Sequence, residues 1–161
     1  MRLAALVLAA ALAACAPESP GDIEAPAGAA APGATPDVAT QLGLSWNASA
    51  DGAQLTLTNP DRSTLLALSC ANRTMTALAP GFEEVASEER FSLGADDQVF
   101  ILVAQLGQAE GGRAEGQPAD YFLDHLPSAN EIHANYGAQN LGPHIPPSPE
   151  EARAFAAACR R

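Results

Sequence analysis

Lysine is absent from the 161-residue sequence. All eight basic residues are arginines, against 19 acidic residues, so the formal charge is −11. Without a basic stripe the chain lacks the electrostatic footprint of a nucleic-acid-binding protein, and we expect no nucleic-acid partner. Aromatic residues make up only 5% of the sequence. Any core must therefore be built mainly from Leu, Val, Ile and Ala.

Motifs that carry catalysis or hold cofactors are also missing. The sequence has no GxSxG nucleophile elbow, no P-loop, no GxGxxG loop, no HExxH and no CxxC. Its three histidines, His125, His133 and His144, follow no metal-ligand spacing, and we expect them on the surface or in loops. Adjacent carboxylates such as Asp96-Asp97 are expected to be solvated. The sequence therefore predicts no enzymatic activity, no cofactor and no metal.

The first fifteen residues, MRLAALVLAAALAAC, are typical of a leader. They combine one basic residue, an apolar run too short to span a bilayer, and small residues ahead of Cys15. Residues 12–15 resemble the lipobox of bacterial lipoproteins. This resemblance implies cleavage before Cys15, lipidation of its sulfur, and anchoring of the chain in a bilayer. Ala16 stands where lipoproteins retained in the inner membrane often carry Asp, which implies the outer membrane, facing the periplasm.

The sequence divides into three parts: a signal peptide over 1–14, the lipidated cysteine and a tether over 15–40, and one domain over 41–161. Residues 16–39 contain five Pro and eight Ala, and their only large apolar side chains are Ile23 and Val38. Such a segment cannot offset the entropy of folding. The alternative for the leader is an ordinary secreted protein in which Cys15 occurs by accident.

Period-two alternation of apolar residues predicts a mainly β domain, an antiparallel sandwich or open barrel. Strands are expected over 42–46, 53–57, 65–70, 73–78, 90–93, 99–104 and 132–136. The continuously apolar segment 99–104 is expected to be central and buried on both faces. Segment 107–116 is expected to be a polar, glycine-rich loop.

Two helices complete the predicted domain. A short helix over 119–126 is expected to pack Tyr121, Phe122 and Leu126. At the end of the chain, Ser148 and Glu151 have the spacing of a capping box. The side chains expected on the buried face of the helix that follows are Ala152, Phe155, Ala156 and Cys159. We expect this last helix to pack on the sheet.

Two cysteines remain once Cys15 is lipidated. Cys70 and Cys159 both fall on predicted inward faces, and an even pair in an oxidising compartment favours a disulfide. Two buried free thiols are the alternative. A possible partner surface is the segment that contains Tyr136 and His144, because an aromatic residue there leads into a proline-rich stretch; the alternative is plain packing of Tyr136.

The layout of lipobox, Pro/Ala tether, β-rich domain and C-terminal helix resembles small bacterial lipoproteins of uncharacterised function. The leading hypothesis is a non-enzymatic binding or envelope-accessory module with a protein or envelope partner. One alternative is a periplasmic lysozyme inhibitor, because the chain resembles the membrane-bound inhibitors of C-type lysozyme in size and disulfide placement, but it lacks their Ser-Gly-x-x-Tyr and Lys elements. The other alternative is an envelope hydrolase, which would need a Ser or Asp set against a histidine in a cleft.

Overall fold

The computed structural model describes residues 43–88, 90–107 and 111–161. The predicted leader, lipidation site and tether lie outside these residues. The described elements are β1 (Ser45–Ala48), β2 (Gln54–Thr58), β3 (Thr64–Ala71), β4 (Thr74–Ala79), β5 (Arg90–Ala95), β6 (Gln98–Ala104), β7 (Gly112–Gly116), α2 (Asp120–His125), the 3-10 turn η1 (Leu126–Ser128), β8 (Ile132–Tyr136), β9 (Gln139–His144) and α3 (Pro149–Cys159). The mainly β class, with one short and one C-terminal helix, is confirmed.

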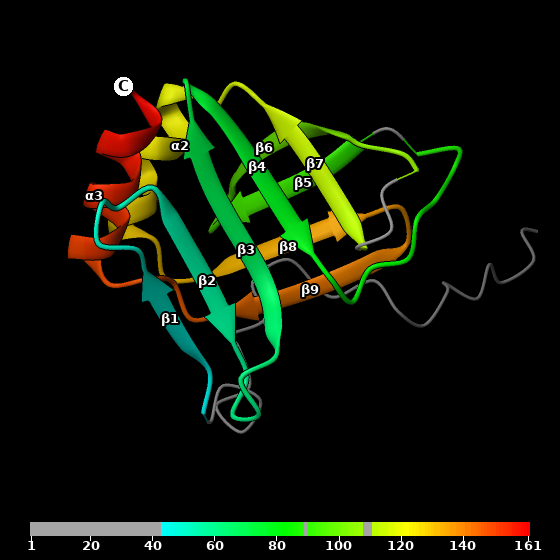
Figure 1. Cartoon of the computed structure of the whole chain (residues 1–161), viewed down its shortest axis with the longest axis horizontal. Coiled ribbons are helices and arrows are strands. Elements are labelled where there is room, and N and C mark those ends of the chain that lie inside the picture. The colour runs from blue at the N-terminus through cyan, green and yellow to red at the C-terminus, as the bar shows by residue number, and fades with distance from the viewer. Residues whose placement is uncertain (1–42, 89, 108–110) are drawn as a thin grey trace, which may run out of the picture. The chain divides into compact units, whose positions relative to one another are not determined.

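The nine strands form one antiparallel sheet in the order β1-β2-β3-β4-β7-β6-β5-β8-β9. Most neighbours are joined by short hairpins, which explains why local alternation and turn residues predict so much of the sheet. The sheet curls on itself into a half-barrel, so that β2, β3 and β4 cross over β5, β8 and β9 (Figure 1). The two edge strands approach each other, and the Trp46 indole N–H donates a 2.7 Å hydrogen bond to the Ile145 carbonyl, just beyond β9.

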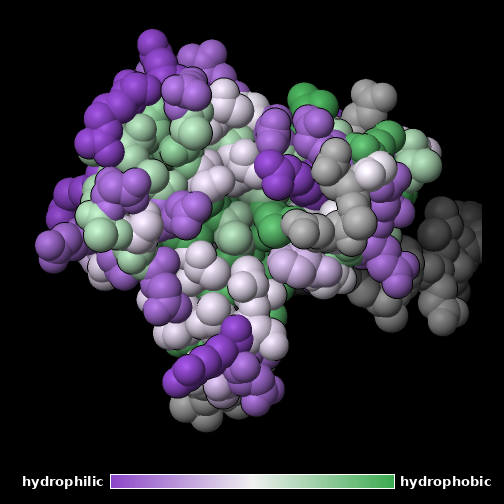
Figure 2. All heavy atoms as spheres, viewed as in Figure 1, coloured by the Kyte–Doolittle hydropathy of each residue, from purple (hydrophilic) through white to green (hydrophobic). Residues whose placement is uncertain are grey.

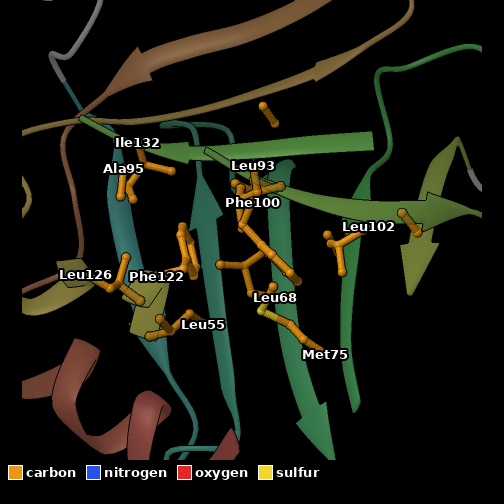
Figure 3. Packing of buried hydrophobic residues seen from close by; sticks show 14 of the residues in the cluster. Leu55, Leu68, Met75, Leu93, Ala95, Phe100, Leu102, Phe122, Leu126 and Ile132 are labelled. Atoms are coloured by element: carbon orange, nitrogen blue, oxygen red, sulfur yellow. The ribbon is translucent and has the colours of Figure 1, made fainter. Parts of the chain in front are cut away.

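The hydrophobic core lies inside the curl. Leu55, Leu68 and Met75 reach in from β2, β3 and β4, and meet Leu93 and Phe100 from the opposite half of the sheet (Figure 3). All of these side chains are buried. Burial of so many aliphatic groups is the main favourable contribution to folding, at about 25 cal/mol per Å² of apolar surface.

The helices close one end of the half-barrel. Phe122 of α2 packs on Phe100, with ring centroids 5.6 Å apart, and α3 lies against β2, β3 and η1 (Figure 1). The predicted capping box is present: the Glu151 N–H donates to the Ser148 hydroxyl, and the Ser148 N–H donates to the Glu151 carboxylate. Tyr121 was expected to pack with Phe122, but it is 51% exposed.

Strand β6 corrects the expectation that segment 99–104 is buried on both faces. Phe100, Leu102 and Ala104 point into the core, whereas Val99, Ile101 and Val103 are 48%, 55% and 59% exposed. A continuous apolar run fits a doubly buried strand, but here only one face is covered. Buried and exposed residues alternate along β6, but all of them are apolar, so the sequence does not reveal the alternation.

Two further strands were missed. The segment predicted to be a loop contains β7, which pairs with β4 along its length and with β6 at Val103 and Ala104. Its only apolar side chain is Ala114, so it carries no alternation and is held by its neighbours' main chains. Residues 139–144, for which no strand was expected, form β9, which pairs with β8 at the edge of the sheet, where a proline such as Pro143 is tolerated.

Candidate functional site: an exposed apolar stripe on strand β6

Three branched aliphatic side chains line the outer face of β6: Val99, Ile101 and Val103. We call them the β6 stripe. Each is about half exposed, with values between 48% and 59%. Contiguous exposed apolar side chains of this kind can mark an interaction site. Figure 2 shows hydrophilic residues over much of the helix end of one face of the molecule.

The main chain of β6 is fixed by hydrogen bonds, and the buried face of the strand is fixed by packing. Residues 98–103 pair with β5 over their full length. On the other side of β6, β7 pairs at Val103 and Ala104. The Val99 carbonyl lies outside this pairing and accepts a 2.8 Å hydrogen bond from the Tyr121 hydroxyl. Under the stripe, Phe100 packs on Phe122. The three aliphatic side chains are thus presented by a rigid strand, which lowers the entropic cost of docking onto them.

The neighbours of the stripe differ at its two ends. At the level of Val103 lie Arg90 on β5 and Glu115 on β7. At the level of Val99 lies Gly94, across which the imidazole of His133 extends so closely that a Cβ at Gly94 would overlap the ring. The stripe is therefore bordered by charged groups at one end and by the His133 imidazole at the other.

Asp96 and His125 form a polar cluster beyond the Val99 end. The Asp96 carboxylate accepts hydrogen bonds from the Asn130 N–H at 2.8 Å and the Glu131 N–H at 3.1 Å, and lies 2.9 Å from His125 Nε2. Burial raises the pKa of Asp96, but these hydrogen bonds outweigh that effect and leave its pKa below the ordinary 3.8. Asp96 therefore joins the β5–β6 turn to the segment before β8, and is not simply solvated.

A hydrolase would need, among other groups, an acid beside a histidine, and Asp96 beside His125 is such a pair. However, Asp96 is already committed to two main-chain N–H groups, and the Ser128 hydroxyl donates to the His125 carbonyl oxygen at 2.9 Å. Two depressions of the described surface lie elsewhere: one of about 40 Å³ beside Cys159 and Arg160, and an open one of about 500 Å³ along β1 and the β2–β3 turn. The geometry thus favours a structural role for the pair.

Replacing Asp96 by Asn should lower the free energy of unfolding at pH 7 by about 1–2 kcal/mol, because a charged acceptor of several hydrogen bonds is lost. The folded-state pKa lies below the unfolded value of 3.8, so the unfolded chain binds the proton first. The stabilisation is therefore complete above the unfolded value and is lost as the pH falls from there through the lower, folded-state pKa. Urea unfolding should show the variant and the wild type converging once the pH lies below the folded-state pKa of Asp96. Asp97→Asn, at the exposed neighbour, is the control, and a pH-independent difference would contradict the assignment.

The predicted pair of cysteines is joined: Cys70, in β3, and Cys159, at the end of α3, form a disulfide that spans 89 positions of the sequence. Both side chains are buried, at 7% and 2% exposure. The bond fastens the last helix to strand β3 of the sheet.

Tyr136 and His144 do not form an exposed surface. Tyr136 is 2% exposed, and its hydroxyl contacts both the N–H and the carbonyl of Val85 at 3.2 Å. His144 pairs with Ile132 across β8 and β9 and is 8% exposed, so burial lowers its pKa below 6.5. The expectation of an exposed partner surface at these two residues fails, because Tyr136 at the end of β8 and His144 at the end of β9 are both buried. His144 is likewise neither a surface nor a loop histidine.

The remaining predicted site residue, Cys15, lies outside the described residues. Within residues 43–88, 90–107 and 111–161, no helix has the length and apolar character needed to cross a membrane. The same part of the chain contains no cluster of three or more His, Cys, Asp or Glu side chains suited to hold a metal ion.

Sequence reasoning missed the β6 stripe and Tyr121. The one available signal was the placement of β-branched residues at 99, 101 and 103 alternating with Phe100 and Leu102, but hydropathy treats both sets alike. Comparison with known proteins gives no further guide: the chain matches no protein-family model, no curated protein and no solved structure.

Proposed function

We propose that this chain is a lipid-anchored, non-enzymatic binding module of the bacterial cell envelope, and that the β6 stripe is its contact surface. The observation that carries the proposal is the half-exposure of Val99, Ile101 and Val103 on a rigid strand. Three adjacent aliphatic side chains in water are unfavourable, by about 25 cal/mol for each Å² of apolar surface, unless another surface covers them.

Two other features support the proposal. The Cys70–Cys159 disulfide suits an oxidising compartment such as the periplasm. The lipobox-like sequence before Cys15 and the Pro/Ala-rich segment over 15–40 would hold the domain near the membrane. We place the chain in the outer membrane, facing the periplasm.

The proposal is tested by asking whether the stripe is covered in the cell. In the full chain, an Ile101→Cys side chain should react with a water-soluble maleimide at least tenfold more slowly in intact envelopes than in a dilute detergent extract. Thr74→Cys, on the exposed outer face of β4, is the matched control and should react equally in both. Equal reactivity of Cys at position 101 in the two preparations would show that nothing covers the stripe.

A further inference from the structure

The open depression along β1 and the β2–β3 turn lies on a part of the domain that the proposed function does not use. Strand β1 is at one edge of the sheet (Figure 1), and β2, β3, β4 and β7 separate it from β6. The depression measures about 500 Å³, and small-molecule sites commonly measure about 300–1,000 Å³. It is lined by Gly43, Ser45, Asn47, Thr58, Asn59, Pro60 and Arg62.

The lining is polar, and it contains hydroxyl and amide side chains but no carboxylate. In a chain with 19 acidic residues, this leaves one place that an anionic group can approach without meeting a like charge. A hydroxyl both donates and accepts a hydrogen bond, and an amide offers a donor and an acceptor side by side. The hydroxyl groups of a ligand need partners of both kinds, so the depression suits a polyhydroxylated molecule better than an apolar one.

Three of these polar side chains are joined in a row. The Thr58 hydroxyl lies 3.2 Å from the Ser45 hydroxyl and accepts a 3.3 Å hydrogen bond from the Asn47 amide nitrogen. Ser45 and Thr58 are also paired across β1 and β2, so the row stands on a regular section of the sheet. Within the described residues the Asn47 amide oxygen has no hydrogen-bond donor, and it remains available as an acceptor for a ligand.

The β2–β3 turn presents the Asn59 amide and the Arg62 guanidinium. The Ser63 N–H donates to the Asn59 amide oxygen, and the Arg62 N–H donates to the Asn59 carbonyl, both at 2.9 Å. These bonds fix the turn and leave the Asn59 amide nitrogen as a donor. Arg62 has a φ of 64°, a conformation that glycine adopts at the least cost, yet this position carries a long cationic side chain.

Arg62 is the cation of the depression. In the part of the chain that the structure describes, Arg62 forms no ion pair, whereas Arg90, Arg113 and Arg160 each pair with an acidic side chain. A guanidinium binds a carboxylate through two parallel hydrogen bonds. One guanidinium balances the single charge of a carboxylate but not the larger charge of a phosphate monoester, which is about −1.5 to −2 at neutral pH.

We propose that this depression binds an acidic saccharide, a sugar ring that carries one carboxylate. The row on β1 and β2 and the Asn59 amide bind the ring hydroxyls, and Arg62 binds the carboxylate. The side chains are fixed before the ligand arrives, which reduces the entropic cost of binding, but the site is open to water and its affinity is weak. This inference goes beyond the proposed function, because no part of it depends on the β6 stripe.

The test is an NMR titration of the full chain in detergent micelles with three probes. Methyl glucuronide carries the ring and the carboxylate, methyl glucoside carries the ring alone, and acetate carries the carboxylate alone. Methyl glucuronide should shift the side-chain amide signals of Asn47 and Asn59, and should bind about fivefold more tightly than methyl glucoside, the upper end for an exposed ion pair. The Trp46 indole N–H, which donates to the Ile145 carbonyl, is an internal control and should not shift.

Three variants identify the groups that bind. Arg62→Gln should weaken the binding of methyl glucuronide about fivefold, to the level of methyl glucoside, because glutamine keeps a donor and loses the charge. Arg153→Gln, at an exposed position of α3, removes the same charge outside the depression and should change neither affinity. Thr58→Val should weaken both sugars alike, because it removes the hydroxyl at the centre of the row. The spectrum of each variant shows whether it has folded.

Four results would overturn the inference. They are the absence of shifts at Asn47 and Asn59 with methyl glucuronide, equal affinity of the wild type for the two sugars, an equal loss of affinity in Arg153→Gln and Arg62→Gln, and shifts with acetate as large as those with methyl glucuronide. The last result would mean an adventitious ion only. None of them affects the maleimide protection expected at Ile101, so failure of this inference and failure of the proposed function are distinguishable.

Discussion

The Cys159→Ser chain should unfold at a temperature at least about 10 °C below that of the wild type. Its disulfide partner, Cys70, lies 89 positions away, and closing a loop of that length restricts the unfolded chain by about 4–5 kcal/mol in the chain-entropy model. Each kcal/mol corresponds to several degrees in a domain of this size. The helix also contributes packing, since Phe155 and Ala156 are buried beside Cys159, and this packing should hold α3 in a folded but less stable domain.

Thermal unfolding followed by circular dichroism, with and without a reductant, measures this effect. Reductant should lower the melting temperature of the wild type and leave that of Cys159→Ser unchanged. The melting temperature of Cys70→Ser should fall by about as much as that of Cys159→Ser. That of the double variant should fall little further, because all three variants lack the same disulfide. A loss of less than about 3 °C in the single variant would mean that burial of α3, and not the covalent link, stabilises this end of the half-barrel.

The Cys15→Ala chain should lose its lipid completely. The lipobox-like sequence predicts that the Cys15 sulfur carries the diacylglycerol through a thioether. Alanine has no thiol at which that thioether could form. The variant should incorporate no palmitate analogue, should keep its leader, and should not be processed by the lipoprotein signal peptidase. Together the acyl chains of a lipoprotein bind a bilayer stably, at about 0.8 kcal/mol for each buried CH₂, whereas a single chain binds marginally.

Metabolic labelling followed by gel fluorography gives the result directly. Cys159→Ser is the matched control, since it also removes one cysteine but should label as strongly as the wild type. Fractionation of inner and outer membranes then tests the placement inferred from Ala16, which should bring the labelled chain to the outer membrane. Normal labelling of Cys15→Ala would end the lipoprotein hypothesis and would favour the accidental cysteine.

The elements that the sequence predicted well are those whose signals are local. The capping box needs only Ser148 and Glu151 three positions apart. The hairpin strands β2, β3 and β4 each alternate buried with half-buried or exposed residues, and β5, though shorter in the prediction, follows the same pattern at its start. For these elements each residue's environment depends mostly on neighbours that are close in the sequence.

The candidate site was not predictable in this way. Ile101 and Leu102 have nearly the same hydropathy, yet one is 55% exposed and the other 1%. Which of them faces the core depends on how β6 lies between β5 and β7, and β7 is a strand only because its neighbours on both sides offer main-chain partners. Asp96 was expected to be solvated. The N–H groups that donate to it belong to residues 130 and 131, far along the chain, so the sequence around Asp96 gives no sign of them.

By itself, the sequence determined the β-rich class, the capped final helix and the two cysteines available to pair, because periodicity, end-capping and residue counts act over short distances or over the composition as a whole. Only the tertiary structure decided that β7 and β9 are strands, that Tyr136 and His144 are buried, and that β6 turns three aliphatic side chains to water. Main-chain pairing between distant segments and the curl of the sheet settle these points. Both depend on contacts that no local pattern of side chains encodes.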